Sequence, residues 1–344
     1  MRKLATIRQI NGIRSIPEAD KICTYVVDGW TIVDTKGKYE IGNLVVMCEI
    51  DSWIPTELAP FLSKGKEPRE FNGVKGERLR TIKLRGQLSQ GLLLPVDILR
   101  SKIAESDFEY LGDCGGMDVS EVLGIQKWEK PIPAQLAGQV RGNFPSLVPK
   151  TDQERIQNLK KELELWKTRE YTWEVTEKLE GSSCTMYMDL EGIFHVCSRN
   201  LDLKEDDNNA FWKVAKKYNV REKLQDKLGL AIQGELIGPG VQANYYGLPD
   251  YEFRVFDIYD VKSGKYLNAY ERIVFCHENF LQYAPLTIID WKMFNETIDD
   301  LLVMAEGNSV INDKKEREGL VFKCIEDTSI HFKAISNKFL LKSE

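Results

Sequence analysis

A lysine and a carboxylate lie two residues apart at the end of a strand-like segment, in the stretch TWEVTEKLEGSSCTMYM at residues 172–188. The flanking residues suit a pleated surface, and a Gly-Ser-Ser turn follows Lys178 and Glu180. A neutral lysine can attack the α-phosphate of a nucleotide, although its reference pKa is about 10.4. A carboxylate beside it can hold the water shell of a divalent metal. The pair therefore indicates nucleophilic chemistry on a phosphate.

Later segments add groups of the same kind at strand ends, together with an aromatic residue on a strand. These are Glu235 in QGELIGPG, Phe256 in EFRVFDIYD, Glu318 and Lys323 in EREGLVFK, and Lys333 in SIHFKAISNK. Each segment alone is a weak signal, because Glu beside Gly is usually a turn and a strand Phe is usually core. Their joint occurrence in this order predicts one pocket.

The charged groups of such a pocket would have separate tasks. The two later lysines would supply a positive field that lowers the pKa of the nucleophile and neutralises phosphate oxygens. Glu235 and Glu318, with Glu180, would hold Mg²⁺ or Mn²⁺ mostly through water. Phe256 could stack on a base, a contact worth about 1–3 kcal/mol in single-strand systems.

With these motifs the sequence resembles the covalent nucleotidyltransferase superfamily of ligases and mRNA capping enzymes. KLEGSS is similar to the motif that bears the nucleotidyl-lysine, and CSRN to the short arginine motif after it. QGELIGPG and VFDIYD are similar to the middle motifs, EGLVFK to the fourth and HFKAISNKF to the fifth. More closely, the chain resembles the RNA ligases of the Deinococcus and Naegleria type, which carry an OB domain ahead of the catalytic domain, over nearly its full length.

The resemblance implies an ATP-dependent RNA ligase that seals breaks between a 3′-hydroxyl and a 5′-phosphate, in RNA repair. Lys178 would attack ATP to give lysyl-AMP and pyrophosphate, AMP would pass to the 5′-phosphate, and the 3′-hydroxyl would displace AMP. The implied partners are RNA ends, in a nicked duplex or on a strand with an RNA 3′-hydroxyl. The protein is expected to act as a monomer, away from membranes.

The resemblance also implies the site residues. The catalytic set is Lys178, Glu180, Lys323 and Lys333. The metal set is Glu180, Glu235 and Glu318, for Mg²⁺ or Mn²⁺. The set that binds ATP is Glu177, Lys178, Arg199, Glu235, Phe256, Glu318, Lys323 and Lys333. Within it, Arg199 would contact the ribose or the nucleic-acid end, Phe256 would pack on adenine, and the two later lysines would grip the phosphates.

Three positions depart from the family pattern. Glu180 stands where many ligases have Asp, which changes the reach of the carboxylate by one methylene. Ile335 replaces the second lysine of the fifth motif, and Lys338 has a different spacing. Ser183 stands where some RNA ligases have Asn.

The sequence also bears on two other classes of protein. Most ATP-dependent DNA ligases and the GTP-using capping enzymes place an OB domain after the fifth motif, and we expect none here because only eleven residues follow Lys333. A non-catalytic protein that binds RNA ends could keep the fold but would lose Lys178, Glu318 or Lys333, and all three are present. The choice of ATP over GTP follows from the resemblance alone.

The composition sets the broad class. A chain of 344 residues with 42% hydrophobic and 29% charged residues predicts a globular protein of two domains. No apolar run reaches about 18 residues, and the start lacks a signal-peptide pattern, so a cytoplasmic or nuclear location is expected. The seven cysteines are scattered and never spaced as CxxC, which favours buried thiols over a zinc site or disulfides.

The predicted fold class is α+β, with an OB-like β-barrel ahead of a nucleotidyltransferase domain. Residues 1–130 read as short strands with turn signals, residues 126–150 as a Pro-rich linker, and residues 131–344 as the catalytic domain. Helices are expected at 151–167, opened by a Thr151 and Glu154 capping box, and at 209–226. Strands are expected at 172–189, 193–199, 230–237, 252–260, 319–325 and 329–335.

A cluster of basic residues stands out in the predicted barrel. The net charge of the chain is −6, yet KGERLRTIKLR at residues 75–85 contains only one acid, Glu77. Such a strip can contact several phosphates, and the alternative is a strand edge protected by charge. We expect this strip, with Lys64 and Lys66, to grip the strand on the 3′-hydroxyl side of a break.

Overall fold

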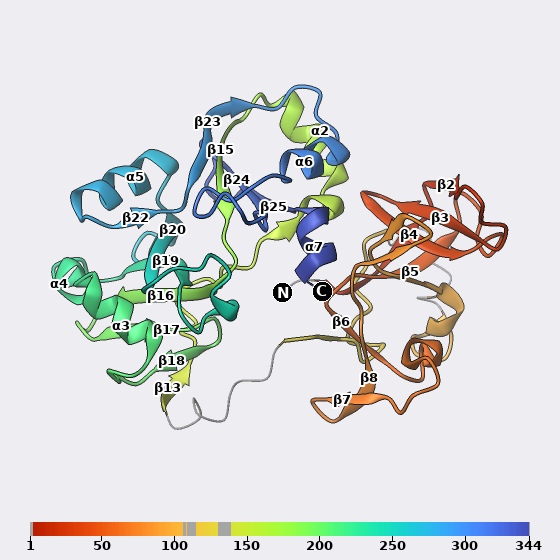
Figure 1. The fold of residues 1–344 in the computed structure, drawn as a ribbon, viewed down its shortest axis with the longest axis horizontal. Helices are drawn as coiled ribbons and strands as arrows, with labels where there is room; N and C mark the ends of the chain where they lie inside the picture. The colour runs from red at the N-terminus through yellow and green to blue at the C-terminus, as the bar shows by residue number, and fades with distance from the viewer. Residues whose placement is uncertain (1–2, 106–107, 109–114, 130–138, 344) are drawn as a thin grey trace. The chain divides into compact units, whose positions relative to one another are not determined.

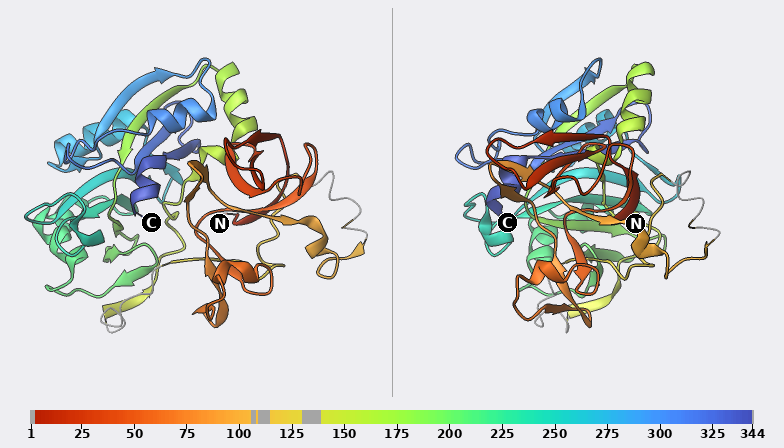
Figure 2. Two further views of the ribbon diagram at one scale, coloured as in Figure 1. Left: turned by 45° about the vertical axis from the view of Figure 1, so that its right-hand side comes forward. Right: turned by 90° about the vertical axis from the view of Figure 1, so that its right-hand side faces the viewer.

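The computed structural model describes residues 3–105, 108, 115–129 and 139–343, and these form two compact units (Figures 1 and 2). The first unit contains Met1–Pro131 and Leu340–Glu344, and the second contains Ile132–Phe339. The predicted boundary and the middle of the predicted linker fall in 130–138, outside the described residues. The division at residues 130 and 131 therefore stays a prediction.

The first unit consists of short strands in small sheets, as the many turn signals predicted. The sheets have the strand orders β1-β5-β11, β2-β3-β4, β12-β6-β8-β7 and β10-β9. The strands are β1 (Ala5–Gln9), β2 (Gly12–Ser15), β3 (Ile22–Val27), β4 (Trp30–Thr35), β5 (Leu44–Cys48), β6 (Ser52–Pro55), β7 (Arg69–Phe71), β8 (Val74–Arg78), β9 (Ile82–Leu84), β10 (Gln87–Ser89), β11 (Leu92–Pro95) and β12 (Gln126–Lys127). The 3-10 helices η1 (Pro60–Ser63) and η2 (Val96–Leu99) connect them.

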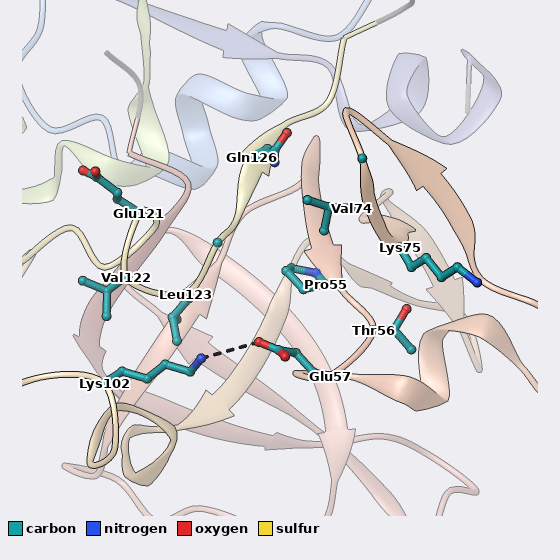
Figure 3. A pocket seen from close by; sticks show the side chains of 12 residues that line it. Pro55, Thr56, Glu57, Val74, Lys75, Lys102, Glu121, Val122, Leu123 and Gln126 are labelled. Carbon is teal, nitrogen blue, oxygen red and sulfur yellow. Dashed lines mark hydrogen bonds and ion pairs between the residues drawn. The ribbon is translucent and has the colours of Figure 1, made fainter.

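The core of this unit forms where the alternating apolar residues of its central strands meet the flanking turns. Ile7, Val46 and Leu94, from the three paired strands β1, β5 and β11, are buried together with Leu99 and Leu123. An open groove between β6, β8 and the turns around residue 122 is lined by Glu57, Lys75, Lys102 and Glu121 among others (Figure 3). Its charges balance, and Lys102 pairs with Glu57 at 3.5 Å.

The second unit is built on two larger sheets. The eight-stranded sheet has the order β13-β18-β17-β16-β19-β20-β21, with β22 also paired to β20, and the five-stranded sheet has the order β14-β25-β24-β15-β23. The strands are β13 (Val140–Asn143), β14 (Glu154–Arg155), β15 (Thr172–Lys178), β16 (Ser182–Met188), β17 (Phe194–Cys197), β18 (Leu201–Leu203), β19 (Leu230–Ile237), β20 (Glu252–Asp260), β21 (Lys265–Tyr266), β22 (Gln282–Tyr283), β23 (Leu286–Lys292), β24 (Gly319–Cys324) and β25 (His331–Ile335).

Helices pack on one face of each sheet (Figure 1). The helices are η5 (Ile156–Asn158), α2 (Lys160–Thr168), α3 (Ala210–Lys217), α4 (Val220–Leu224), η6 (Gln242–Asn244), α5 (Ala269–Glu278), α6 (Ile298–Met304) and α7 (Asn337–Ser343). Trp212 of α3 and Leu224 of α4 pack on the eight-stranded sheet. Trp166 of α2 and Leu301 of α6 pack on the five-stranded sheet.

The sequence located most of these elements. The expected strands at 230–237 and 252–260 are β19 and β20 residue for residue, while the expected strand at 172–189 is two strands joined by a turn. The expected helix at 209–226 begins after its Asn209 cap but is divided at Asn219, whose φ of 48° ends α3. Six cysteines are buried, as expected of thiols, and Cys114 lies outside the described residues.

The predicted capping box at Thr151 and Glu154 is wrong. The helix α2 begins only at Lys160, and its N-cap residue, Leu159, makes no side-chain cap. Thr151 Oγ1 instead lies 3.0 Å from Ser183 Oγ, and Glu154 belongs to β14, which pairs in parallel with β25. Tertiary pairing with β25 therefore overrides the local capping signal. None of the helices in the described ranges is long and apolar enough to span a membrane.

Candidate active site

One face of the five-stranded sheet collects the lysines that the sequence singled out. In the antiparallel register, Lys178 of β15 pairs with Gly319 of β24, and Gly319 pairs with Ile335 of β25. Lys323 lies four residues along β24 from Gly319, and Lys333 two residues along β25 from Ile335. Because side chains alternate between faces, all three lysines share the face opposite the helix-covered core.

The ammonium of Lys178 is held by a carboxylate. Its Nζ lies 2.6 Å from Glu318 Oε1, and the two side chains are only 26% and 14% exposed. Burial by itself lowers the pKa of Lys178, but the carboxylates of Glu318, Glu235 and Glu180 outweigh it and raise the pKa above the ordinary value. The expectation that neighbouring cations lower this pKa is therefore wrong for the nucleotide-free protein, because anions surround the amine.

Glu235, on the other sheet, is near enough for its charge to act on the same amine. It lies on β19, opposite Ser183 of β16, and is half-buried. Burial raises the pKa of Glu235 to about 8, with Glu318 and Glu180 adding to the rise and Lys178 opposing it. Three carboxylates thus converge around one lysine, and one of them binds its proton unusually tightly.

A divalent cation fits this arrangement. Glu318 Oε2 is buried without a hydrogen-bond partner, and the carboxyl groups of Glu180, Glu235 and Glu318 act on one another electrostatically beside Lys178. Across the described ranges, however, no three carboxylate, imidazole or thiol groups come close enough to chelate an ion directly. That Mg²⁺ or Mn²⁺ is held here mostly through its water shell stays a prediction.

Two motif glycines let the strands approach closely enough to assemble this site. A Cβ on Gly181 would lie 2.5 Å from the carbonyl oxygen of Leu236 on β19 and 2.8 Å from Glu235 Cγ. A Cβ on Gly319 would lie 2.2 Å from the carbonyl oxygen of Ala334 on β25. Glycine is therefore needed beside each carboxylate because any side chain would push a neighbouring strand away.

A β-bulge sets the position of Phe256. In the pairing of β19 with β20, Gln233 faces Asp257 and Gly234 faces Val255, so Phe256 is the extra residue. Val255 and Ile258 pack in the core, and Phe256 is half-buried outside that cluster. The Lys323 ammonium lies 5.7 Å from the ring centre of Phe256 and donates to its carbonyl oxygen. The bulge and the contacts of Lys323 therefore fix the position of the aromatic ring that is expected to pack on the base.

Lys323 is anchored in a buried ionic network that crosses between the two sheets. Its Nζ lies 2.8 Å from Asp257 Oδ1 of β20, while Arg272 of α5 lies 3.7 Å from the same oxygen. Arg272 also forms an ion pair with Glu174 of β15, and both side chains are almost fully buried. The hydroxyl of Tyr283 donates to Glu174 Oε1 at 2.6 Å. Two cations and two anions therefore balance with little access to water.

Helix α5 presents Arg272 to this network through its own N-terminus. Asn268 and Glu271 form a complete capping box, in which each side chain accepts a hydrogen bond from the backbone of the other. Burial lowers the pKa of Lys323, and the nearby Arg272 adds to this effect against the opposing carboxylate of Asp257. The Lys323 side chain is thus committed to Asp257 and Phe256 in this state of the protein.

The Glu177 carboxylate lies apart from the cluster, whereas Arg199 is near enough that its charge lowers the pKa of Glu235. The Glu177 side chain lies on the core face of β15, opposite to Lys178, and accepts a hydrogen bond from Val310 N at 2.7 Å. Arg199 follows β17 and pairs with Asp152 at 2.5 Å, with both side chains substantially exposed. Lys333 is half-buried on the lysine face of the sheet. The structure therefore gathers Lys178, Glu180, Glu235 and Glu318, and the roles of all the predicted site residues stay predictions.

Sequence reasoning missed a turn that holds the nucleophile segment. Gln242, Ala243 and Asn244 are three consecutive residues with φ between 43° and 54°, a left-handed conformation that costs non-glycine residues about 1–2 kcal/mol each. Gln242 Nε2 donates to Gly181 O at 3.3 Å. The buried Tyr246 hydroxyl accepts from Glu180 N at 2.8 Å. The only signal in the sequence is the run of turn residues after Glu235.

Comparisons with known proteins agree with this geometry. A family model described as RNA ligase matches residues 171–342, and an OB-fold domain model matches residues 4–96. No curated protein sequence matches the chain. Solved structures do match: a variant of Naegleria gruberi RNA ligase with ATP and Mn is 40% identical, with a TM-score of 0.88 over 99% of this chain and 100% of that one.

Two further structures of the same Naegleria gruberi enzyme are similar over equally long spans. A variant with AMP and Mn is 40% identical, with a TM-score of 0.89 over 100% of both chains. The enzyme with pyrophosphate is 41% identical, with a TM-score of 0.86 over 99% of this chain and 98% of that one. The expected OB fold and the expected α+β nucleotidyltransferase fold are both confirmed.

Proposed function

Because this chain belongs to the RNA ligase family, we propose that Lys178 is the nucleophile with which it activates ATP. The protein is an ATP-dependent RNA ligase that uses a divalent metal and acts on RNA ends. The observation that supports Lys178 most strongly is its position at a strand end among three carboxylates, on the same face as Lys323 and Lys333.

In the first step, the neutral Lys178 Nζ attacks the α-phosphorus of ATP. A P–N bond forms, the bond from that phosphorus to the bridging oxygen breaks, and pyrophosphate leaves with the electron pair of that bond. The amine loses its proton. Before this attack the ion pair with Glu318 must open, because the protonated amine has no lone pair.

The carboxylates Glu180, Glu235 and Glu318 would hold the metal, which as a bound Mg²⁺ or Mn²⁺ supplies charge neutralisation to phosphate oxygens. Lys333 would contact the phosphates from the same face as Lys178. Phe256 would pack on adenine, and Arg199 would contact the ribose or the RNA end. Lys323, which is bound to Asp257 and Phe256 in the free protein, would reach the phosphates only by leaving Asp257.

In the second step, an oxygen of the RNA 5′-phosphate attacks the phosphorus of lysyl-AMP, the P–N bond breaks, and Lys178 takes up a proton. In the third step, the 3′-hydroxyl attacks the 5′-phosphate, loses its proton, and releases AMP. We infer that the substrate is a nicked duplex or a strand with an RNA 3′-hydroxyl, and that the first unit holds the strand that ends in the 3′-hydroxyl. The monomeric state stays a prediction.

The test is to incubate the purified protein with α-labelled ATP and Mg²⁺ or Mn²⁺, then denature it and look for label on the polypeptide. Label that is absent from Lys178→Ala and is chased into a joined strand by nicked RNA would support the proposal. Label from GTP alone would support a capping-type enzyme. No label from either nucleotide, in protein free of bound AMP, would support a protein that only binds RNA ends.

A further inference from the structure

The β9–β10 hairpin of the first unit is a two-stranded arm. Within the part of the chain that the structure describes, its strands Ile82–Leu84 and Gln87–Ser89 pair only with one another. Arg85 and Gly86 join them with φ of 47° and 81°, the two positive values of a tight type I′ turn. All three residues of β9 are exposed. An isolated two-stranded ribbon is marginally stable in water, so this arm needs support.

The support comes from the base of the arm. Ser89 Oγ accepts a hydrogen bond from Val33 N of β4 at 3.0 Å, and Gln90 N donates to Thr31 O at 2.8 Å. Both Ser89 and Gln90 are almost completely buried. The base of the hairpin is therefore attached to β4, and its tip extends into solvent.

The predicted basic strip divides into two parts at this arm. On β8, the cations are matched within the unit, because Arg78 pairs with Asp51 at 2.6 Å and lies 4.1 Å from the ring centre of Trp128. On the arm, Lys83 and Arg85 have no ion-pair partner among the described residues. Uncompensated positive charge thus collects at the tip, in a chain whose net charge is −6.

Apolar side chains accompany this charge. Ile82 and Leu84 are 47% and 38% exposed, and they share one face of β9 while Lys83 points to the other. Duplex RNA offers phosphates beside a wide, shallow minor groove lined by ribose. A ribbon with cations on one side and apolar groups on the other matches that surface, because the cations meet phosphates and the apolar groups meet sugars.

We propose that the β9–β10 hairpin is a duplex-RNA-binding arm, in which Lys83 and Arg85 contact phosphates and Ile82 and Leu84 contact riboses of the minor groove. This inference rests on the proposed function. It identifies the β9–β10 hairpin as the part of the first unit that binds the RNA. The cations matched on β8 then contribute less to RNA affinity than the arm does.

The experiment measures binding of a labelled nicked RNA duplex to the full-length protein at several salt concentrations. The test variant is Lys83→Ala with Arg85→Ala. The control is Lys21→Ala with Lys36→Ala, which removes the same charge from two exposed lysines at one end of the β2-β3-β4 sheet. A third variant, Ile82→Ser with Leu84→Ser, removes the apolar contact and keeps the charge.

Loss of two phosphate contacts should weaken binding roughly 10- to 100-fold at 50 mM salt and lower the slope of log K against log salt by about 2. The control should keep the wild-type slope. The serine variant should bind several-fold more weakly with an unchanged slope. Lysine labelling by ATP alone should be the same in all variants, since none of these residues belongs to the nucleotide site.

The Lys83 and Arg85 variant could instead keep the wild-type affinity and slope, with normal labelling by ATP. That result would contradict RNA binding by the hairpin and would leave the proposed function standing. Loss of labelling in the wild-type protein would instead overturn the proposed function. A serine variant that changes only self-association, measured by sedimentation, would contradict an RNA contact for the apolar face. Circular dichroism of each variant checks that the sheets remain folded.

Discussion

The Lys178 ammonium and the Glu318 carboxylate form an ion pair at 2.6 Å, between the end of β15 and the residue before β24. The pair joins the nucleophile to a carboxylate that is proposed to hold the metal. It keeps the amine charged until substrates arrive, because the surrounding carboxylates raise its pKa. Activation of the nucleophile is therefore tied to the arrival of positive charge at the carboxylates.

This state of the amine can be measured by acylation. In nucleotide-free protein, Lys178 should react with an amine-selective reagent only at higher pH than exposed lysines do, because a raised pKa leaves less neutral amine at any given pH. Glu318→Gln should move the reaction to lower pH. Mass spectrometry of the peptides follows each lysine separately, with exposed Lys36 as an internal standard. A Lys178 midpoint at or below that of Lys36 would contradict the ion pair.

Glu235 should destabilise the protein at high pH. Its pKa of about 8 lies above the ordinary 4.5, so the folded state binds this proton more tightly than the unfolded chain does. Stability from this group is present below pH 4.5 and is lost as the pH rises towards 8. Glu235→Gln should therefore raise the Tm by roughly 2–4 °C at pH 9 and leave it unchanged at pH 4.

The exposed Glu222→Gln is the matched control for this effect and should leave the Tm unchanged at both pH values. Glu235→Gln should also lose most ATP-dependent labelling, because it removes a proposed metal carboxylate. A Tm that falls at pH 9 would show that Glu235 stabilises the fold as an anion, against the direction of its pKa.

The buried ionic network should depend on charge balance. Arg272→Met leaves Glu174 without its cation and should cost about 3–5 kcal/mol in the free energy of unfolding. Adding Glu174→Gln to that variant should recover part of the loss, because the remaining Asp257 and Lys323 still balance. Denaturant unfolding measures Arg272→Met, Glu174→Gln and the double variant. As a control, Lys216→Met removes a cation from an exposed ion pair and should change the free energy of unfolding by less than about 1 kcal/mol. Strict additivity of the Arg272 and Glu174 changes would argue against a single network.

Tyr246 should matter for the rate of lysine labelling. Tyr246→Phe leaves Glu180 N without its acceptor, a loss of about 1.4 kcal/mol that corresponds to about a tenfold slower reaction. The metal concentration for half-maximal labelling should also rise, since the Glu180 turn loosens. Tyr218→Phe removes an exposed hydroxyl bonded to Gln282 at 3.2 Å and should change neither quantity. Equal effects of the two substitutions on stability alone would leave Tyr246 with no positioning role.

Much of the site could be predicted from sequence, because strand alternation and the motif order place Lys178, Glu235 and Glu318 at neighbouring strand ends. The remainder depended on long-range packing. The bulge at Phe256 exists only in the pairing with β19, and the network around Arg272 joins three distant segments. The sign of the field on Lys178 also could not be read from residue types, because it depends on which charges come nearest. The ion pair between Lys323 and Asp257 likewise has no signal in the spacing of the motifs along the chain.

The central claim is that Lys178 carries AMP during the reaction, and peptide mapping tests it most directly. The wild-type protein, incubated with ATP and Mn²⁺ without RNA, should yield one modified peptide, with AMP on Lys178. That modification should disappear when nicked RNA is added. AMP on Lys323, Lys333 or any other lysine, or an unmodified Lys178 in protein that still joins RNA, would contradict the account.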